Sequence, residues 1–179
     1  MILTGNDILR LIVRGVLRIE PLDPTRVREQ LQPAGIDLRI ADRYCVMRGG
    51  PVIQTWSILN VGVDDHYYCN ESDTIALEPG NVYLLHTIEK VCLPNDIVGL
   101  VTLRSTFARL GLVMPPTVVD PGFCGQLTLE LYNASRSTIM VRRGQRLVQL
   151  VLMITTSPSE PYSGRYQHQT GVTLPRLPA

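Results

Sequence analysis

The sequence contains no long apolar run, and neither sign of charge is in excess. Its apolar stretches fall far short of the roughly 20 residues that a membrane helix needs, and its first residues lack the basic and then apolar order of a secretory signal. The 17 basic and 16 acidic side chains give a net charge of +1, too little for a broad nucleic-acid surface. We therefore expect a cytoplasmic protein with neither a membrane nor a nucleic-acid partner, in which any anion site is local.

The cysteines and histidines lack the spacing of a metal site. No Cys-x-x-Cys pair is present, and none of the three histidines lies at ligand spacing from another histidine. Zinc-dependent nucleoside deaminases use His-x-Glu and Pro-Cys-x-x-Cys to activate water, and both motifs are missing. We expect no zinc site. The cysteines are expected to be buried thiols, with disulfides an alternative only in a hyperthermophilic source; they are Cys45, Cys69, Cys92 and Cys124.

At 179 residues the chain is long enough for one domain with a substantial core. Thr4 as an N-cap and Asp7 in the first turn predict a helix near the N-terminus, which Gly15 ends. Alternating apolar residues separated by turn residues then predict strands of a sandwich or barrel. The expected strands are residues 17–21, 36–40, 73–77, 82–85, 97–103, 126–132, 138–141 and 147–154.

Small and helix-tolerant residues at 105–111 interrupt the strand pattern. They predict a helix of one or two turns that Gly111 ends. The first backbone N–H groups of this helix, beside Arg104, Ser105 and Thr106, would form an anion site. The alternative is an ordinary connection between a strand and a helix, capped by Ser105.

One carboxylate, Glu130, lies inside the strand expected at residues 126–132. Leu127, Leu129 and Leu131 alternate with Glu130 and therefore face the opposite side of the strand. The face that carries Glu130 either meets water or lines a site. The other residues of that polar face are Gln126, Thr128 and Tyr132.

From Ser157 the chain is rich in Pro, Ser, Gly and Gln and has little apolar periodicity. We therefore divide the chain into a β domain, residues 1–156, and a C-terminal tail of the same domain, residues 157–179. The tail is either a disordered end or a functional flap.

The motifs of the chain resemble the signature of the dCTP deaminase and dUTPase superfamily. Arg104-Ser-Thr-Phe-Ala-Arg109 precedes the turn Asp120-Pro-Gly-Phe123 and then the strand with Glu130. The resemblance implies a mainly β fold, a dUTPase-like distorted jelly-roll or β-clip with a short N-terminal helix and one short internal helix. Further segments similar to superfamily motifs are Pro33-Ala-Gly-Ile-Asp-Leu-Arg39, Gly144-Gln-Arg-Leu-Val-Gln149 and the tail from Pro161 to Arg176.

The strand glutamate favours the deaminase branch, because trimeric dUTPases usually have an aliphatic residue at that position. The resemblance thus implies zinc-independent hydrolysis of dCTP to dUTP and ammonia, which supplies dUTP for dUMP and dTTP synthesis. Glu130 would act first as general base and then as general acid. Ser105 would orient the water, and Arg109 would hold Glu130 and the charge that develops around the pyrimidine.

The resemblance also implies the contacts of the nucleotide. Arg104 and its neighbours are expected at the triphosphate, Asp120 at the deoxyribose 3′-hydroxyl, and the backbone of Thr128 and Leu129 at the base. Mg²⁺ is expected to bind through phosphate oxygens and water rather than protein side chains. The family implies a homotrimer with active sites between its chains. The full set of expected substrate contacts is Arg104, Ser105, Thr106, Phe107, Ala108, Arg109, Asp120, Thr128, Leu129, Glu130, Gln149, Tyr162, Arg165 and Gln169.

Other functions stay open at this point. A bifunctional dCTP deaminase and dUTPase, or a plain dUTPase, would yield dUMP and pyrophosphate in the same triphosphate pocket. A nucleotide sensor without activity, or a structural β-clip module, would need the fold but not the chemistry. Tyr67, Tyr68 and Trp56 match no motif, and we expect them to make packing or trimer contacts.

Overall fold

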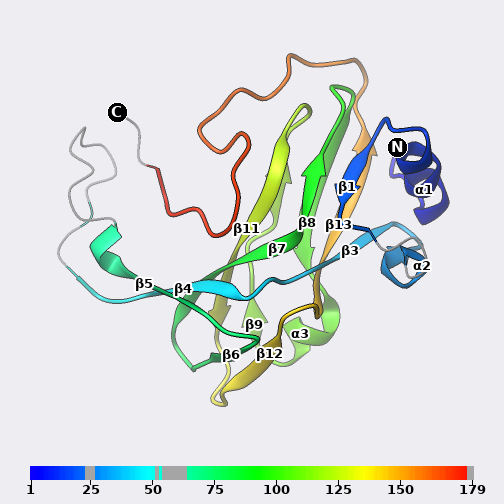
Figure 1. Ribbon diagram of the computed structural model, residues 1–179. Coiled ribbons are helices and arrows are strands. Elements are labelled where there is room, and N and C mark those ends of the chain that lie inside the picture. Colours follow the sequence, from blue (N-terminus) through cyan, green and yellow to red (C-terminus); the bar gives the residue numbers. More distant parts are fainter. Residues whose placement is uncertain (23–26, 51–52, 54–63, 177–179) are drawn as a thin grey trace.

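The computed structural model describes residues 1–22, 27–50, 53 and 64–176 (Figure 1). Trp56 lies outside the described residues. The helical elements are α1 Gly5–Val13, α2 Val27–Gln30, η1 Asp64–His66 and α3 Ser105–Arg109. The strands are β1 Arg18–Glu20, β2 Leu31–Gln32, β3 Gly35–Arg39, β4 Arg43–Met47, β5 Tyr67–Glu71, β6 Thr74–Leu77, β7 Val82–Cys92, β8 Ile97–Leu103, β9 Leu112–Val113, β10 Thr117–Val119, β11 Cys124–Asn133, β12 Ile139–Arg142 and β13 Arg146–Ile154.

Two antiparallel sheets share one apolar core. The first has the strand order β5-β4-β7-β11-β9, with β1 also paired to β7, and the second has the order β10-β8-β13-β3-β2. Leu85 and Leu129 enter the core from the first sheet, and Leu150 and Leu152 enter it from the second. All four side chains are at most 1% exposed, so the sheets are held together mainly by buried apolar area. The expected mainly β fold with a short N-terminal and a short internal helix is confirmed.

The N-terminal helix begins and ends where its sequence predicts. The Thr4 hydroxyl accepts a hydrogen bond from the Asp7 N–H, and the Asp7 carboxylate accepts one from the Thr4 N–H at 3.1 Å, which completes a capping box. Gly15 follows the last turn with a φ of +71°, a conformation that favours glycine. The side chain of Ile8 is fully buried and fastens the helix to the core.

The alternation expected around Glu130 is confirmed in β11. Leu127, Leu129 and Leu131 are buried, whereas Glu130 is partly exposed. Glu130 lies directly opposite Leu84 of β7, and paired residues of antiparallel strands share a face. Glu130 therefore stands on the face of this sheet that is turned away from the apolar core.

The region between residues 41 and 72 contains strands that the sequence pattern did not predict. β4 pairs with both β5 and β7, so that β5 forms the edge of the first sheet. In β5 the sequence Tyr67-Tyr-Cys-Asn-Glu71 has little alternation between apolar and polar residues, and the strand is fixed by pairing with β4 rather than by burial. The local signal for an edge strand is weak for that reason.

The expectation of buried thiols is wrong. Cys45 in β4 forms a disulfide with Cys69 in β5, and Cys92 in β7 forms one with Cys124 in β11. Each pair is directly opposite in an antiparallel register, with Cα atoms 4.0 Å and 3.9 Å apart. Separations of 24 and 32 residues in the chain gave no sign of this pairing, because it depends on which strands become neighbours.

Candidate active site

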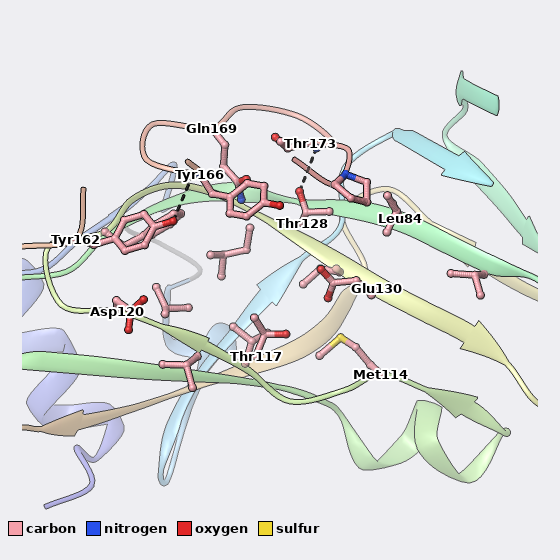
Figure 2. A pocket seen from close by; sticks show the side chains of 18 of the residues that line it. Leu84, Met114, Thr117, Asp120, Thr128, Glu130, Tyr162, Tyr166, Gln169 and Thr173 are labelled. Atoms are coloured by element: carbon pink, nitrogen blue, oxygen red, sulfur yellow. Dashed lines mark hydrogen bonds between the residues drawn. The ribbon is translucent and has the colours of Figure 1, made fainter. Parts of the chain in front are cut away.

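A cavity of about 540 Å³ lies beside Glu130. Figure 2 shows Glu130 pointing from β11 toward Met114, which precedes β10, and Thr117, the first residue of β10, with the C-terminal tail above. The volume lies in the range of small-molecule sites. Among the residues that line it are Tyr67, Leu84, Met114, Thr117, Asp120, Phe123, Thr128, Leu129, Glu130, Tyr162, Tyr166, Gln169, Thr173 and Pro175.

Burial raises the pKa of the Glu130 carboxyl above its usual value of 4.5, and a hydrogen bond from its own backbone opposes this change in part. The cause is desolvation, since removing a carboxylate from water disfavours its charged form. A carboxyl group whose pKa is raised holds a proton more readily than a free one, which helps it to return a proton that it has accepted. Glu130 is therefore a candidate for the general base and acid that the sequence predicts.

The tail is bound along the edge of the cavity. The Gln126 N–H donates to the Gln169 carbonyl at 2.9 Å, and the Gln169 side chain donates to the Gln126 carbonyl at 2.7 Å. Further along, the Thr173 N–H donates to the Thr128 hydroxyl at 3.1 Å. These bonds hold the tail against β11.

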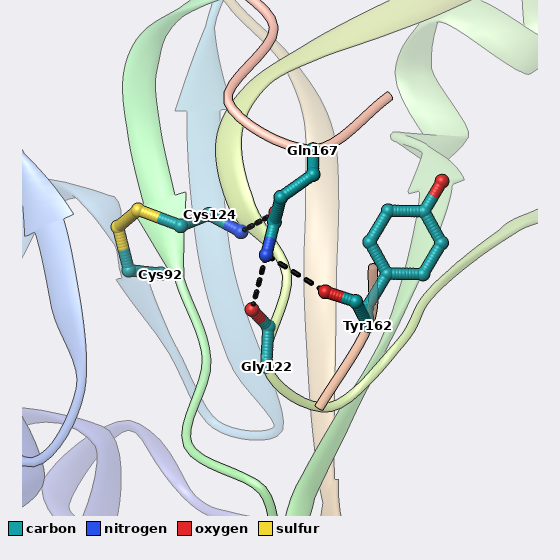
Figure 3. Close-up of a disulfide and its surroundings, with 5 residues drawn as sticks. All are labelled: Cys92, Gly122, Cys124, Tyr162 and Gln167. Atoms are coloured by element: carbon teal, nitrogen blue, oxygen red, sulfur yellow. Dashed lines mark hydrogen bonds between the residues drawn. A yellow bond between two sulfur atoms is a disulfide. The ribbon is translucent and has the colours of Figure 1, made fainter. Parts of the chain in front are cut away.

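A second set of contacts fixes the beginning of the tail to the turn before β11 (Figure 3). The Cys124 N–H donates to the Gln167 side-chain oxygen at 2.8 Å, and the Gln167 amide donates to the carbonyls of Gly122 and Tyr162, each at 2.9 Å. The rings of Phe123 and Tyr162 also pack, with centroids 5.8 Å apart. The tail is therefore anchored beside the Cys92–Cys124 disulfide.

Gly122 is required in this turn for two reasons. The Phe123 N–H donates to the Asp120 carbonyl at 3.1 Å, and Gly122 adopts a φ of +79° to close the turn. A Cβ atom on Gly122 would also come within 2.7 Å of the Pro161 Cα. The turn thus places Asp120 at the cavity and lets the tail approach the backbone closely.

A second cavity, of about 580 Å³, is rich in arginine. Arg104 lies on it and forms an ion pair with the buried Asp37, with its Nε 3.1 Å from the carboxylate, while its Nη1 donates to the Arg146 carbonyl at 3.0 Å. Burial raises the pKa of Asp37, and the charges of Arg104 and Arg146 oppose this change. The lining residues are Glu29, Gln30, Arg39, Arg104, Thr106, Phe107, Gly144, Gln145 and Arg146.

The structure distributes the expected site residues over separate places. The first cavity brings together Asp120, Thr128, Leu129, Glu130, Tyr162 and Gln169, and the second brings together Arg104, Thr106 and Phe107. Ser105, Ala108 and Arg109 are exposed on α3, outside both cavities as the described residues form them.

Two further expected contacts also lie outside both cavities of the described chain. Gln149 lies in β13 opposite Asp37 and Thr102. The guanidinium of Arg165 donates to the Arg176 carbonyl at 2.9 Å. Phe107, expected at the substrate, is 7% exposed and belongs mainly to the core.

Some residues of the first cavity were not expected there. Tyr67 comes from the edge strand β5, and Met114 lies between β9 and β10. Thr117 is the first residue of β10, and Tyr166 and Thr173 belong to the tail. The sequence signal was present only for Tyr166, which stands between two expected tail contacts. Tyr67 is distant in sequence from every other cavity residue, so only the pairing of β4 with β5 and β7 brings it there.

The described residues contain no group of three or more His, Cys, Asp and Glu side chains with the geometry of a metal site. In the same part of the chain, no helix is both long and apolar enough to cross a membrane.

Comparisons with known proteins agree with the motifs. The dCTP deaminase of Hyperthermus butylicus is 42% identical over 181 residues, covering 98% of this chain and 99% of the relative. The dCTP deaminase of Aeropyrum pernix is 44% identical over 179 residues, covering 99% and 97%.

Solved structures share the fold. The 2′-deoxycytidine 5′-triphosphate deaminase from Agrobacterium tumefaciens matches with a TM-score of 0.67 at 26% identity over 86% of this chain. The match covers 48% of the Agrobacterium chain, so this protein spans about half its length. A dUTPase from phage phi11 of Staphylococcus aureus has a TM-score of 0.51 at 18% identity, over 82% of this chain and 94% of that one, and shows likeness of fold alone. A family model described as dCTP deaminase-like matches residues 2–155, and the chain therefore belongs to the dCTP deaminase-like family.

Proposed function

We propose that this protein hydrolyses dCTP to dUTP and ammonia. The observation that carries the proposal is Glu130, a half-buried strand carboxylate with a raised pKa that faces a cavity of nucleotide size. Relatives that are 42 to 44% identical over nearly their full length bear the name dCTP deaminase, which supports the same reaction.

In the proposed reaction, a water molecule attacks C4 of the cytosine while the ionised Glu130 accepts one of its protons. The tetrahedral adduct then collapses as Glu130 returns the proton to the amino nitrogen, and the C–N bond breaks to release ammonia. The remaining hydroxyl proton is transferred to N3 of the ring as the C4 carbonyl of dUTP forms, so the two protons of the water end on ammonia and on N3. One carboxylate performs both transfers, and a raised pKa favours this because the group holds the accepted proton more readily until it is returned.

The site is proposed to be completed by a neighbouring copy in a homotrimer. Glu130 lies at the first cavity, whereas Ser105 and Arg109 are exposed on α3 and reach neither cavity of their own chain. Exposed groups of this kind are available to a second chain. Ser105 and Arg109 of one chain would then face Glu130 of the next, which would place an oriented cation beside the developing charge.

The arginine-rich second cavity is proposed to receive the triphosphate. Arg104 is held there by the buried Asp37, so its guanidinium is oriented before phosphate arrives. Mg²⁺ would enter with the nucleotide, held by phosphate oxygens and water, as is common for this ion. Asp120 and the backbone of Thr128 and Leu129, all at the first cavity, would contact the deoxyribose and the base.

The first experiment incubates the purified protein with dCTP and Mg²⁺, with dUTP in a parallel tube, and resolves the nucleotides by ion exchange. We expect dUTP and ammonia to accumulate from dCTP. Glu130→Gln should retain dCTP binding and lose turnover, whereas the exposed β5 residue Glu71, changed to Gln, should have no effect. Turnover by Glu130→Gln at the rate of the unmodified protein would refute the mechanism, and dUMP in either tube would reveal a dUTPase activity.

A second experiment tests whether the site is shared between chains. Glu130→Gln and Arg109→Ala are each expected to be inactive, but unfolding and refolding them together should restore activity. If each site takes Glu130 from one chain and Arg109 from its neighbour, about one quarter of sites in randomly mixed trimers carry both intact residues. A mixture as inactive as its components would place both residues in one chain and contradict the shared site.

A further inference from the structure

Tyr67 lies at the candidate active site although no motif contains it. It is the first residue of β5, the edge strand of the first sheet, and it lines the same cavity as Glu130. The two residues are 63 positions apart in the numbering of the chain, and they come from strands separated by β4 and β7. The folded sheet therefore adds a phenol to the surroundings of the carboxylate.

The strand register places Tyr67 on the same face as Glu130. Glu130 pairs with Leu84 of β7, Leu84 pairs with Cys45 of β4, and Cys45 pairs with Cys69 of β5. Directly paired residues share a face, and so do residues two apart in one strand. Tyr67, two positions from Cys69, consequently points to the side of the sheet that carries Glu130. The disulfide between Cys45 and Cys69 holds β5 in this register.

Electrostatics agrees with this placement. Burial raises the pKa of the Tyr67 hydroxyl, and the negative charge of Glu130 raises it further. Among the described residues, the other titratable groups that line the cavity are Asp120, Tyr162 and Tyr166. His86 is two positions from Leu84 and therefore lies on the same face of β7, where it pairs with Thr128 of β11. Burial lowers the pKa of His86. Of these groups, only Glu130 contributes a charge that affects Tyr67.

The Tyr67 hydroxyl and the Glu130 carboxylate face one cavity without a direct hydrogen bond between them in the described structure. A small polar molecule between them would contact both groups. A phenol donates one hydrogen bond and accepts others, which suits the oxygen of a water molecule whose proton is passing to a carboxylate.

We propose that Tyr67 is a further catalytic residue, whose hydroxyl holds the hydrolytic water against the Glu130 carboxylate. The proposal rests on the proposed deamination of dCTP. It assigns to the chain that carries Glu130 a group that orients the water. Ser105, to which the family resemblance gives a similar role, is exposed on α3 and would come from a neighbouring chain.

Tyr68 provides a matched control within the same strand. It alternates with Tyr67 and therefore faces the other side of the sheet. Its side chain is 48% exposed, and the Arg48 guanidinium lies 4.2 Å from its ring centre. Tyr67→Phe and Tyr68→Phe each remove one hydroxyl from β5, so a general effect on the edge strand would appear in both variants.

The test compares steady-state deamination of dCTP by the unmodified protein, Tyr67→Phe and Tyr68→Phe, with thermal unfolding of each. Tyr67→Phe should lower kcat by about tenfold or more, because a hydrogen bond to a group that carries charge in the transition state is lost. KM for dCTP and the unfolding temperature should change little, and Tyr68→Phe should match the unmodified protein. A kcat for Tyr67→Phe equal to that of the unmodified protein would overturn the proposal.

A titration that needs no activity separates the two proposals. Isotope-labelled tyrosine, followed by NMR and assigned with Tyr67→Phe, reports the pKa of Tyr67 in the unmodified protein and in Glu130→Gln. We expect that pKa to fall in Glu130→Gln, because the nearby negative charge is removed. An unchanged pKa would refute the proximity of Tyr67 and Glu130 even if dCTP is deaminated. A lower pKa in a protein that does not deaminate dCTP would confirm the proximity and refute both the deaminase function and the role in holding water.

Discussion

Removal of the Cys92–Cys124 disulfide should lower the free energy of unfolding and also loosen the tail. The bridge joins β7 to β11 across 32 positions of the chain. Because Cys124 also donates its N–H to Gln167 and accepts a hydrogen bond from the His168 N–H at 2.8 Å, the bridge fixes the strand segment to which the tail is bound. The double variant Cys92→Ala, Cys124→Ala tests both effects.

The magnitude follows from the length of the closed loop. Chain entropy predicts that a bridge across 32 residues stabilises the folded state by about 3.7 kcal/mol at room temperature. The same relation gives about 3.5 kcal/mol for the Cys45–Cys69 bridge, which spans 24 residues. The two disulfides should therefore contribute almost equally to the free energy of unfolding, although only Cys92–Cys124 is adjacent to the tail.

The assay measures denaturant unfolding of both double variants at one fixed protein concentration, followed by brief trypsin digestion under native conditions. Both variants should lose a similar free energy of unfolding. Only Cys92→Ala, Cys124→Ala should be cut faster after Arg165, which is exposed in the tail. Equal rates of cleavage after Arg165 in the two variants would refute the coupling between this disulfide and the tail. A loss far below about 3 kcal/mol would refute the entropic estimate.

Three further changes are expected to have measurable effects. Glu130→Gln should stabilise the protein at neutral pH, because the raised pKa of Glu130 means that its ionised form is disfavoured in the folded state. This gain in stability should shrink as the pH falls through the raised pKa toward the usual value of 4.5, because Glu130 is then protonated in both the folded and the unfolded state. A gain in chemical unfolding that does not depend on pH would contradict the raised pKa of Glu130. Arg104→Met should lower the free energy of unfolding by about 3 kcal/mol, because it removes a positive charge that pairs with the buried carboxylate of Asp37. Arg143→Met removes one side of an exposed ion pair with Asp42 and should lower the free energy of unfolding by no more than about 0.5 kcal/mol. Equal losses in unfolding experiments would show that Asp37 does not depend on Arg104. Gly122→Ala and Gly144→Ala both place a side chain at a φ of +79° and should each cost about 1 kcal/mol. Only Gly122→Ala should also release the tail, because its Cβ would meet Pro161 while nothing lies within 4 Å of a Cβ on Gly144; identical tryptic cleavage of the two variants would argue against that contact.

Local patterns in the sequence determined several elements of this protein. The capping box of Thr4 and Asp7 fixes the start of α1, because its two hydrogen bonds lie within one helical turn. The alternation of leucines with Glu130 fixes which face of β11 is buried, because successive side chains of a strand point to opposite sides. The motif that contains Glu130 indicated the family for the same reason, since its residues lie within one continuous stretch of chain.

Tertiary structure alone decided which distant residues meet. The pairing of Cys92 with Cys124, and the arrival of Tyr67 at the cavity of Glu130, depend on strand order and register, which short-range patterns do not encode. Folding likewise separated Ser105 and Arg109 from that cavity, although sequence motifs had grouped all three catalytic candidates. Local sequence grouped Asp120, Glu130 and Gln169 as candidate site residues, and the first cavity brings these three together. The distribution of the other candidates in space follows from long-range strand pairing and burial of the shared core.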